Sequence, residues 1–224
     1  MDMGMSNTSA LDHITVTAPN LNVGAAYVQR CLGVEMQAGG EHPRMGTHNL
    51  LLRLGDALFL EVIAPNPDAP RPDRARWFGL DRLQAESPAA LTTWVVRCDD
   101  IHGLSAQTSE PLGKVEPMTR GALHWHITIP ESGDVPLDGV APSLIEWPPG
   151  MHPARQLTDF GLSLQRLVIR HPQPERVSSL LTRLKLHAPV AVCACTPAES
   201  AGLKAEIQTP AGLRTLGFDA RLSF

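Results

Sequence analysis

The stretch Thr47–Pro65, THNLLLRLGDALFLEVIAP, holds two apolar runs of the β type, separated by Gly55 and Asp56. Gly-Asp between two such runs is typical of a hairpin, so the stretch predicts two neighbouring strands. The second run carries one carboxylate, Glu61, with apolar residues on both sides. Since an ionised carboxylate is costly to bury without a partner, we expect Glu61 to meet a positive or hydrogen-bonding group.

The residues upstream of this hairpin complete a small module. LDHITVTAP (residues 11–19) alternates between polar and apolar side chains, which predicts a strand with His13 on its polar face. Asn20 is a good helix N-cap and Gly33 a good helix stop, so the apolar spacing between them predicts a helix. With a short strand expected at 34–38, the module consists of a strand, a helix and three strands.

The same order of elements recurs along the chain, at intervals longer than those of solenoid repeats. LTTWVVRC (91–98), GALHWHITIP (121–130) and SLIEW (143–147) are strand-like, and a third copy begins at LQRLVIRHP (164–172). Segments rich in proline separate the copies, as expected at module boundaries. The predicted organisation is a flexible N-terminus (1–10), a first module (11–70), a connection (71–90), a second module (91–153) and a C-terminal third module (154–224).

The composition narrows the range of partners. The chain has 224 residues and a formal net charge of −4, with acidic and basic residues spread along it. Because there is no basic block, we expect no nucleic-acid partner, and because no segment approaches the ~20 apolar residues of a membrane span, we expect no membrane partner. The start MDMGMSNTSA lacks the features of a secretory signal, which favours a cytoplasmic location.

Four segments carry a resemblance to a known family: LDHITVTAPNL (11–21), GGEHPRMGTHNLLLRLGDALFLEVIAP (39–65), GALHWHITIP (121–130) and APSLIEWPPGMHP (141–153). Together with the module order, they resemble the glyoxalase-like domain family of bacterial proteins, within the vicinal oxygen chelate (glyoxalase/bleomycin resistance/dioxygenase) superfamily. The resemblance implies an α+β fold of tandem βαβββ modules whose sheets curl into an open cup. The same fold serves lyases, isomerases, dioxygenases and drug-sequestering proteins, so it does not settle the chemistry.

The resemblance also implies a divalent metal at the base of the cup, held by residues on the first and fourth strands of each paired module. These positions are occupied here by His13 and Glu61 in the first module and by Thr93 and Glu146 in the second. A metal would give Glu61 its partner. Thr93 departs from the pattern, because a hydroxyl is a poor ligand, so that position is open, filled by water or taken by another side chain. The set suits Zn, Ni, Mn, Fe(II) or Mg.

Three further histidines are candidates for the same site. His48 is on the third strand of the first module and is a candidate metal ligand. His124 and His126 flank Trp125 on a strand of the second module, so they project to one face and Trp125 to the other. If that face is the cup, these two histidines could donate to substrate or carry protons near neutral pH, and we name them with Glu61 as candidate catalytic residues.

Each assignment has an ordinary structural alternative. Glu61 could pair with Arg53 or Arg44, which are near in sequence, and His13 could be a hydrogen-bonded strand histidine without ligand function. The third module has Arg166 at the position of His13 and no acid on its last strand, so it is expected to complete the sheet or form a homodimer contact. The other histidines are expected to be solvated: His42, His102, His152, His171 and His187.

The function expected from the resemblance is that of a glyoxalase-like, metal-dependent isomerase or lyase. Such an enzyme binds a small oxygenated metabolite through two vicinal oxygens and moves a proton. The alternative is a metal-independent protein that binds or sequesters a small drug or toxin in the same cup. An extradiol-type dioxygenase would need two histidines and one carboxylate, with His48, His124 or His126 in the place of Thr93.

Overall fold

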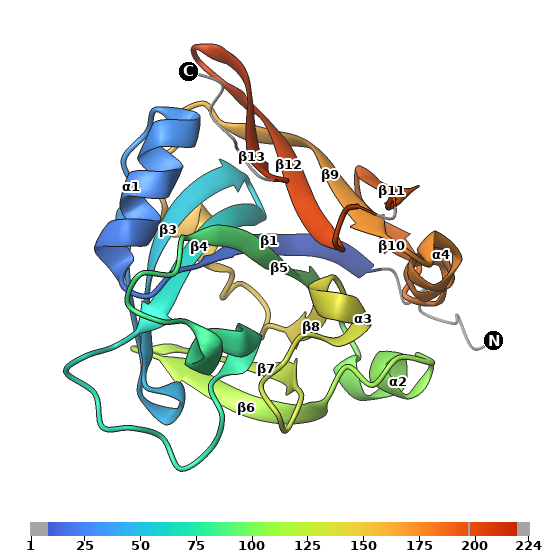
Figure 1. Cartoon of the computed structure of the whole chain (residues 1–224). Helices are drawn as coiled ribbons and strands as arrows, with labels where there is room; N and C mark the ends of the chain where they lie inside the picture. The colour runs from blue at the N-terminus through green and yellow to red at the C-terminus, as the bar shows by residue number, and fades with distance from the viewer. Residues whose placement is uncertain (1–8, 197, 219–224) are drawn as a thin grey trace.

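The computed structural model describes residues 9–196 and 198–218. Within these ranges, the strands form one nine-stranded sheet and one four-stranded sheet. The larger sheet curls strongly into a half-barrel (Figure 1), which confirms the predicted α+β fold with paired βαβββ modules.

The first module follows the predicted order of elements. Its helix starts after the N-cap Asn20, whose side chain accepts a hydrogen bond of 3.0 Å from Val23 N, and it ends at Gly33 in the left-handed conformation. The second strand begins a few residues later than expected. The elements are β1 (Ser9–Thr17), α1 (Leu21–Leu32), β2 (Gln37–His42), β3 (Thr47–Gly55) and β4 (Leu58–Pro65).

The second module joins the first along one edge. Its elements are β5 (Ala90–Arg97), α2 (Ile101–Ala106), β6 (Lys114–Arg120), β7 (Leu123–Ile129), α3 (Pro136–Gly139) and β8 (Ser143–Glu146). The strand order is β2-β3-β4-β1-β5-β8-β7-β6, with β1 and β5 antiparallel at the centre. The two modules therefore run outward from the centre in the same strand order, and β2 and β6 form the two ends of the curled sheet.

The two faces of the sheet pack differently. On β1, Ile14 and Val16 are fully buried in the large core that lies outside the cup. A second apolar cluster, which includes Ile63, Val95 and Trp125, lies on the inner face. Because side chains alternate along β1, His13 is directed into the cup, as the polar–apolar pattern predicts.

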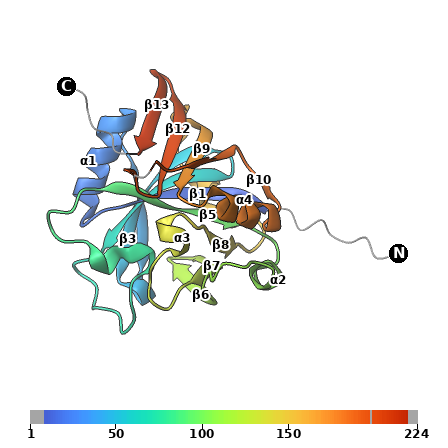
Figure 2. The same cartoon turned by 45° about the vertical axis from the view of Figure 1, so that its right-hand side comes forward.

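The third module forms the smaller sheet, of order β11-β9-β12-β13, and packs beside α1 (Figure 2). Its apolar side chains, among them Leu167, Leu203 and Ile207, belong to the same core as those of the first two modules. One short strand, β10, instead adds to β1 of the larger sheet. The elements are β9 (Ser163–His171), α4 (Pro174–Arg183), β10 (Leu186–His187), β11 (Val190–Ala194), β12 (Gly202–Thr209) and β13 (Gly212–Gly217).

The N-terminal boundary differs from the expectation. Ser9 and Ala10, assigned from sequence to a flexible segment 1–10, belong to β1 and pair with β10. Ser9 is buried, and its hydroxyl donates a hydrogen bond of 2.6 Å to Leu184 O. Pairing with the distant β10 orders these two residues, and that partner is not visible locally in the sequence. The rest of the expected segment, residues 1–8, lies outside the described residues.

The connection between the modules closes over the cup. It contains the 3-10 helix Trp77–Arg82, which is broken at Phe78 and Gly79, where φ is 59° and 67°. Gly79 N donates a hydrogen bond of 2.9 Å to Gly133 O of the second module. Two further 3-10 helices lie at Pro43–Met45 and Pro153–Gln156. Among the described residues, no helix is long and apolar enough to span a bilayer.

Candidate functional site

His13 and Glu61 lie next to each other at the base of the cup. They come from the paired strands β1 and β4, and the distance between His13 Nε2 and Glu61 Oε2 is 3.7 Å. Each residue is 5% exposed. Glu61, with apolar neighbours on both sides in the sequence, is therefore a buried carboxylate that faces a buried imidazole.

Two uncharged side chains hold the carboxylate of Glu61. Asn49 Nδ2 donates a hydrogen bond of 2.6 Å to Oε1, and Thr15 Oγ1 donates one of 3.2 Å to Oε2. The alternative of an arginine partner does not hold, because Arg53 pairs with Asp56 and Arg44 with Glu116. The carboxylate is thus fixed in position by neutral donors.

A β-bulge places a second carboxylate behind the imidazole. Along β1, the residue pairing with β5 shifts between Leu11 and His13, so Asp12 is the extra residue. Asp12 Oδ1 lies 2.6 Å from His13 Nδ1. Because an ionised carboxylate can only accept, His13 Nδ1 is the donor, and Nε2 is directed toward Glu61.

Asp12 is held in its charged form although it is completely buried. Its Oδ2 is 3.1 Å from Trp147 Nε1, 3.1 Å from His152 Nε2 and 3.4 Å from an Arg97 nitrogen. Burial alone would raise the pKa of Asp12, but hydrogen bonds from His13 and His152 outweigh it and hold that pKa well below its usual range. Asp12 therefore stays ionised and, as an anion, orients the ring of His13.

The cavity above this pair is narrow and mostly aromatic. Its free space is about 20 Å³, room for roughly one water molecule. Two charged or titratable side chains, Arg120 of β6 and His42 of β2, reach it besides the pair at its base. Burial, with the nearby charges of Arg120 and His13, lowers the pKa of His42 to about 3. The apolar walls are Phe59, Trp77, Phe78, Trp125, Ile127, Ile145 and Trp147.

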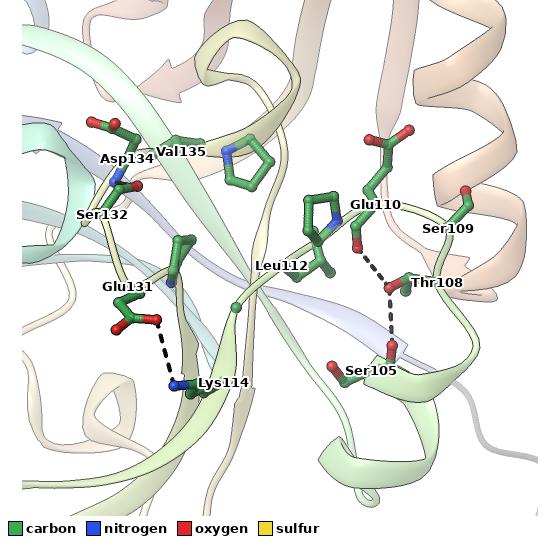
Figure 3. Close-up of a pocket in the computed structure, with 14 residues that line it drawn as sticks. Ser105, Thr108, Ser109, Glu110, Leu112, Lys114, Glu131, Ser132, Asp134 and Val135 are labelled. Atoms are coloured by element: carbon green, nitrogen blue, oxygen red, sulfur yellow. Dashed lines mark hydrogen bonds and ion pairs between the residues drawn. The ribbon is translucent and has the colours of Figure 1, made fainter.

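A wider groove lies outside the cup but does not gather such groups. It has a volume of about 700 Å³ and is bounded by the loops around Glu110 and Ser132 (Figure 3). Its charged side chains are paired with one another or with neighbours: Lys114 with Glu131, Asp134 with Arg82, and Glu110 with Arg176. We therefore place the candidate site in the cup.

The structure separates Glu146 from the pair with which it was grouped. Its neighbours Ile145 and Trp147 line the cavity, so Glu146 projects to the other face of the sheet. There its carboxylate accepts a hydrogen bond of 2.7 Å from Ile101 N, at the start of α2. Glu146 thus binds the first backbone N–H of α2, and the expectation that it lines the cup is wrong.

The three additional histidines are also directed away from the cavity. On β7, Trp125 is buried and lines the cup, while His124 and His126 are exposed on the opposite face. On β3, Asn49 reaches Glu61, so the preceding residue, His48, faces the other way. The pattern correctly put His124 and His126 on one face, but that face is the outer one.

Thr93, the position that departs from the family pattern, is fully buried on β5 opposite Thr15. Its hydroxyl has no hydrogen-bond partner among the residues that the structure describes. Thr15, on β1, donates its own hydroxyl to Glu61. Within the described residues, β5 therefore contributes no ligand to the His13–Glu61 site.

Sequence reasoning missed several residues of the site. His42 and His152 were expected to be solvated, yet they are 3% and 8% exposed. Two polar residues side by side at Asp12 and His13 interrupt the alternation of the strand, and this signal could have indicated the bulge. Nothing local to its sequence indicates that Arg120 faces the cup, because β6 reaches it only through the curl of the sheet.

The donor set decides whether a divalent metal fits. His13 Nε2 and Glu61 Oε2 could be two ligands, and Asp12 on His13 Nδ1 is the outer partner that metal-bound histidines usually have. Within the described residues, however, no third His, Cys, Asp or Glu joins them, whereas protein metal sites commonly have three or four such ligands. Arg120, which lines the same cavity, is a cation. These residues do not form a complete metal site.

Solved structures with this fold include proteins of different kinds. A hypothetical protein from Staphylococcus aureus is 12% identical with a TM-score of 0.60, covering 86% of this chain and 87% of that one. A mutant of 4-hydroxymandelate synthase from Streptomyces coelicolor is 14% identical with a TM-score of 0.53, covering 94% and 62%. A variant of methylmalonyl-CoA epimerase from Streptomyces coelicolor is 18% identical with a TM-score of 0.46, covering 66% and 99%. At these identities, the likeness to the first two structures shows the fold alone.

The sequence itself gives the family. No curated protein matches it. The model of the glyoxalase-like domain matches residues 11–185, which include both modules of the cup and the beginning of the third. The chain is a member of the glyoxalase-like domain family.

Proposed function

We propose that the protein is a glyoxalase-like enzyme that moves a proton on a small oxygenated metabolite, in an isomerase or lyase type of reaction. The observation that carries the proposal is the buried arrangement of Asp12, His13 and Glu61 at the base of the cup. A charged carboxylate fixes one ring nitrogen of His13, and the other faces Glu61 at 3.7 Å. Two groups able to exchange protons thus adjoin the same small cavity.

Their roles follow from this geometry. A carbon next to a carbonyl group would lose its proton to Glu61, which lies beside His13 Nε2, leaving an enolate. A proton, either the one removed or one exchanged with solvent, would then be delivered to that carbon or to a neighbouring atom, so the reaction needs no oxidant or reductant. Asp12 would stabilise His13 when the ring carries the additional proton, because it accepts from Nδ1.

The aromatic walls favour a second function, in which the cup only holds its ligand. Trp125 and Trp147 have ring centroids 5.0 Å apart, and such surfaces bind flat molecules without any chemistry. A sequestering protein would bind the ligand tightly and leave its carbon-bound hydrogens in place. Proton exchange therefore separates the two functions.

The first prediction is that Glu61→Gln abolishes proton exchange. The wild-type protein is incubated in D₂O with phenylpyruvate or pyruvate, and deuterium uptake next to the carbonyl is followed by NMR. We expect uptake above the buffer rate, and a loss of about 10²- to 10⁴-fold in Glu61→Gln, because the substitution keeps the shape but removes the base. Glu41→Gln, at an exposed position of β2, is the matched control and should leave the rate unchanged.

Metal analysis of protein purified without a chelator or a histidine tag accompanies this assay. Equal exchange rates before and after treatment with EDTA are expected from the incomplete donor set. Full exchange by Glu61→Gln would contradict the assigned role. Tight binding without exchange by the wild type would favour the sequestering function.

A further inference from the structure

We infer that Arg120 is the anion-binding residue of the cup, and that the ligand is a small carboxylate with a flat apolar body. This inference deepens the proposed function by naming its substrate class. It rests on the surroundings of Arg120, on the backbone that accommodates its side chain and on the walls of the cavity.

Arg120 is a buried cation that shares the cavity with the carboxylate of Glu61. It is 9% exposed and lines the cavity with His13 and Glu61. Among the described residues, no hydrogen bond or ion pair reaches its guanidinium, although Glu61 is close enough to interact electrostatically. A guanidinium stays charged in proteins, and a buried charge without hydrogen bonds is costly. An anion bound in the cup would supply the missing acceptors.

Four arginines in the segments that connect the strands show the contrast. Arg44 and Arg74 both pair with Glu116, Arg76 pairs with Asp81, and Arg82 pairs with Asp134. Each of these has a carboxylate within the fold. Arg120 is directed instead toward the cavity, and its fork of donors matches a carboxylate in two parallel hydrogen bonds.

The backbone of β2 makes room for this side chain. A Cβ atom on Gly40 would lie 2.9 Å from Arg120 Cγ and 3.1 Å from Cδ. These are atoms near the base of the side chain, so a larger residue at position 40 would push the whole arginine aside. Because position 40 is a glycine, the side chain of Arg120 can extend from β6 across the backbone of β2, at the other end of the sheet. Gly40 is thus a positioning residue.

The apolar walls define the rest of the ligand. Trp125 and Trp147 line the cup, and Trp77 with Phe78 stack on each other over it, with ring centroids 5.3 Å apart. In this arrangement the rings fill the cup, and the free space holds about one water molecule. A ligand that enters must therefore displace these rings and replace the contacts that they make with one another. A flat apolar body can make contacts of the same kind with the rings.

The inference is tested with two ligands of the same size, 3-phenylpropionate and 3-phenylpropanamide, by isothermal titration calorimetry. The wild type should bind the acid at least 10-fold more tightly than the amide. Arg120→Met keeps most of the side-chain volume and removes the charge, and should weaken binding of the acid by roughly 10- to 100-fold, the loss of a charge-assisted hydrogen bond. Its affinity for the amide should not change.

Two other variants keep the result interpretable. Arg183→Met, at an exposed position of α4, should bind both ligands like the wild type. Gly40→Ala retains the arginine but displaces it, so it should weaken binding of the acid and not of the amide. Its circular dichroism spectrum should be unchanged. Equal affinity of the wild type for acid and amide, no binding of the acid, or unchanged acid binding by Arg120→Met would each overturn the inference. Because neither ligand has to react, failure of proton exchange leaves this test unaffected.

Discussion

Asn49 illustrates, for one residue, how the base of the cup is fixed. Its Oδ1 accepts a hydrogen bond of 2.9 Å from Gly40 N, so the amide must turn its Nδ2 donor toward Glu61. A chain of donors and acceptors thus runs from the backbone of β2 to the carboxylate. Asp12 does the same for His13 from the other side, and together they leave one orientation for each group.

His42 gives a prediction about pH at this scale. It is buried, Nδ1 is 3.1 Å from Thr47 Oγ1, and its folded-state pKa is about 3. The ordinary pKa of histidine is 6.5, so between these values the unfolded chain takes up a proton that the folded chain does not. The contribution of His42 to the free energy of unfolding is therefore greatest above pH 6.5, and it decreases as the pH falls from 6.5 toward 3.

When the pH is lowered from 7 to 5, we expect the free energy of unfolding to decrease less in His42→Gln than in the wild type. The difference should be about 2 kcal/mol, which corresponds to roughly 1.5 pH units below the ordinary pKa. Urea unfolding at the two pH values measures it. His102→Gln, at an exposed position of α2, should follow the wild type. An equal pH dependence in wild type and His42→Gln would refute the assignment.

At the scale of elements, β7 shows what local pattern can and cannot determine. The alternation of His124, Trp125 and His126 is visible in the sequence and predicts that the two histidines share a face. Which face is turned to the cup depends on the neighbouring strands, because tryptophan and histidine are both found on half-buried strands. The inner cluster already contains Trp77 and Ile127, and Trp125 extends it.

A pair of variants tests this orientation. Changing both His124 and His126 to threonine, which suits an exposed strand, should alter the free energy of unfolding by no more than about 0.5 kcal/mol. Acid binding should also stay as in the wild type. Trp125→Ala, by contrast, removes a buried ring and should cost about 3–5 kcal/mol. The assignment would be refuted if the histidine variant lost proton exchange while keeping its fold.

For the whole molecule, the shared core unites the three modules. Leu167, Leu203 and Ile207 of the third module pack in the same cluster as Ile14 and Trp94 of the cup. The pairing of β10 with β1 adds a second link between the third module and the larger sheet. The third module is thereby part of the support for β1, the strand that carries His13.

This arrangement predicts a single unfolding transition. Ile207→Ala leaves a cavity in the core of the third module and should lower the free energy of unfolding by about 2–5 kcal/mol. The protein's four tryptophans all lie before residue 148, so fluorescence reports on the cup, whereas far-UV circular dichroism reports on the whole chain. Both signals should shift to the same lower urea concentration. Ser179→Ala, at an exposed position of α4, is the control, and a separate early transition in circular dichroism alone would contradict the prediction.

The sequence by itself determined the features that depend on neighbouring residues. Alternation along residues 11–19 places His13 on the inner face of β1, and caps at Asn20 and Gly33 bound α1, because strand period and helix capping are local properties. The module order and the family segments gave the fold class. The turn after the strand at Gly55 also follows from local chemistry.

Only the tertiary structure decided which side chains converge. Arg120 and Gly40 are distant in sequence and meet because the sheet curls until β6 approaches β2. Asp12 reaches His13, Trp147 and His152 through a bulge against β5 and a long-range contact with the end of the second module. Such contacts depend on strand order, twist and register across the whole sheet, and a local period in the sequence carries no information about them.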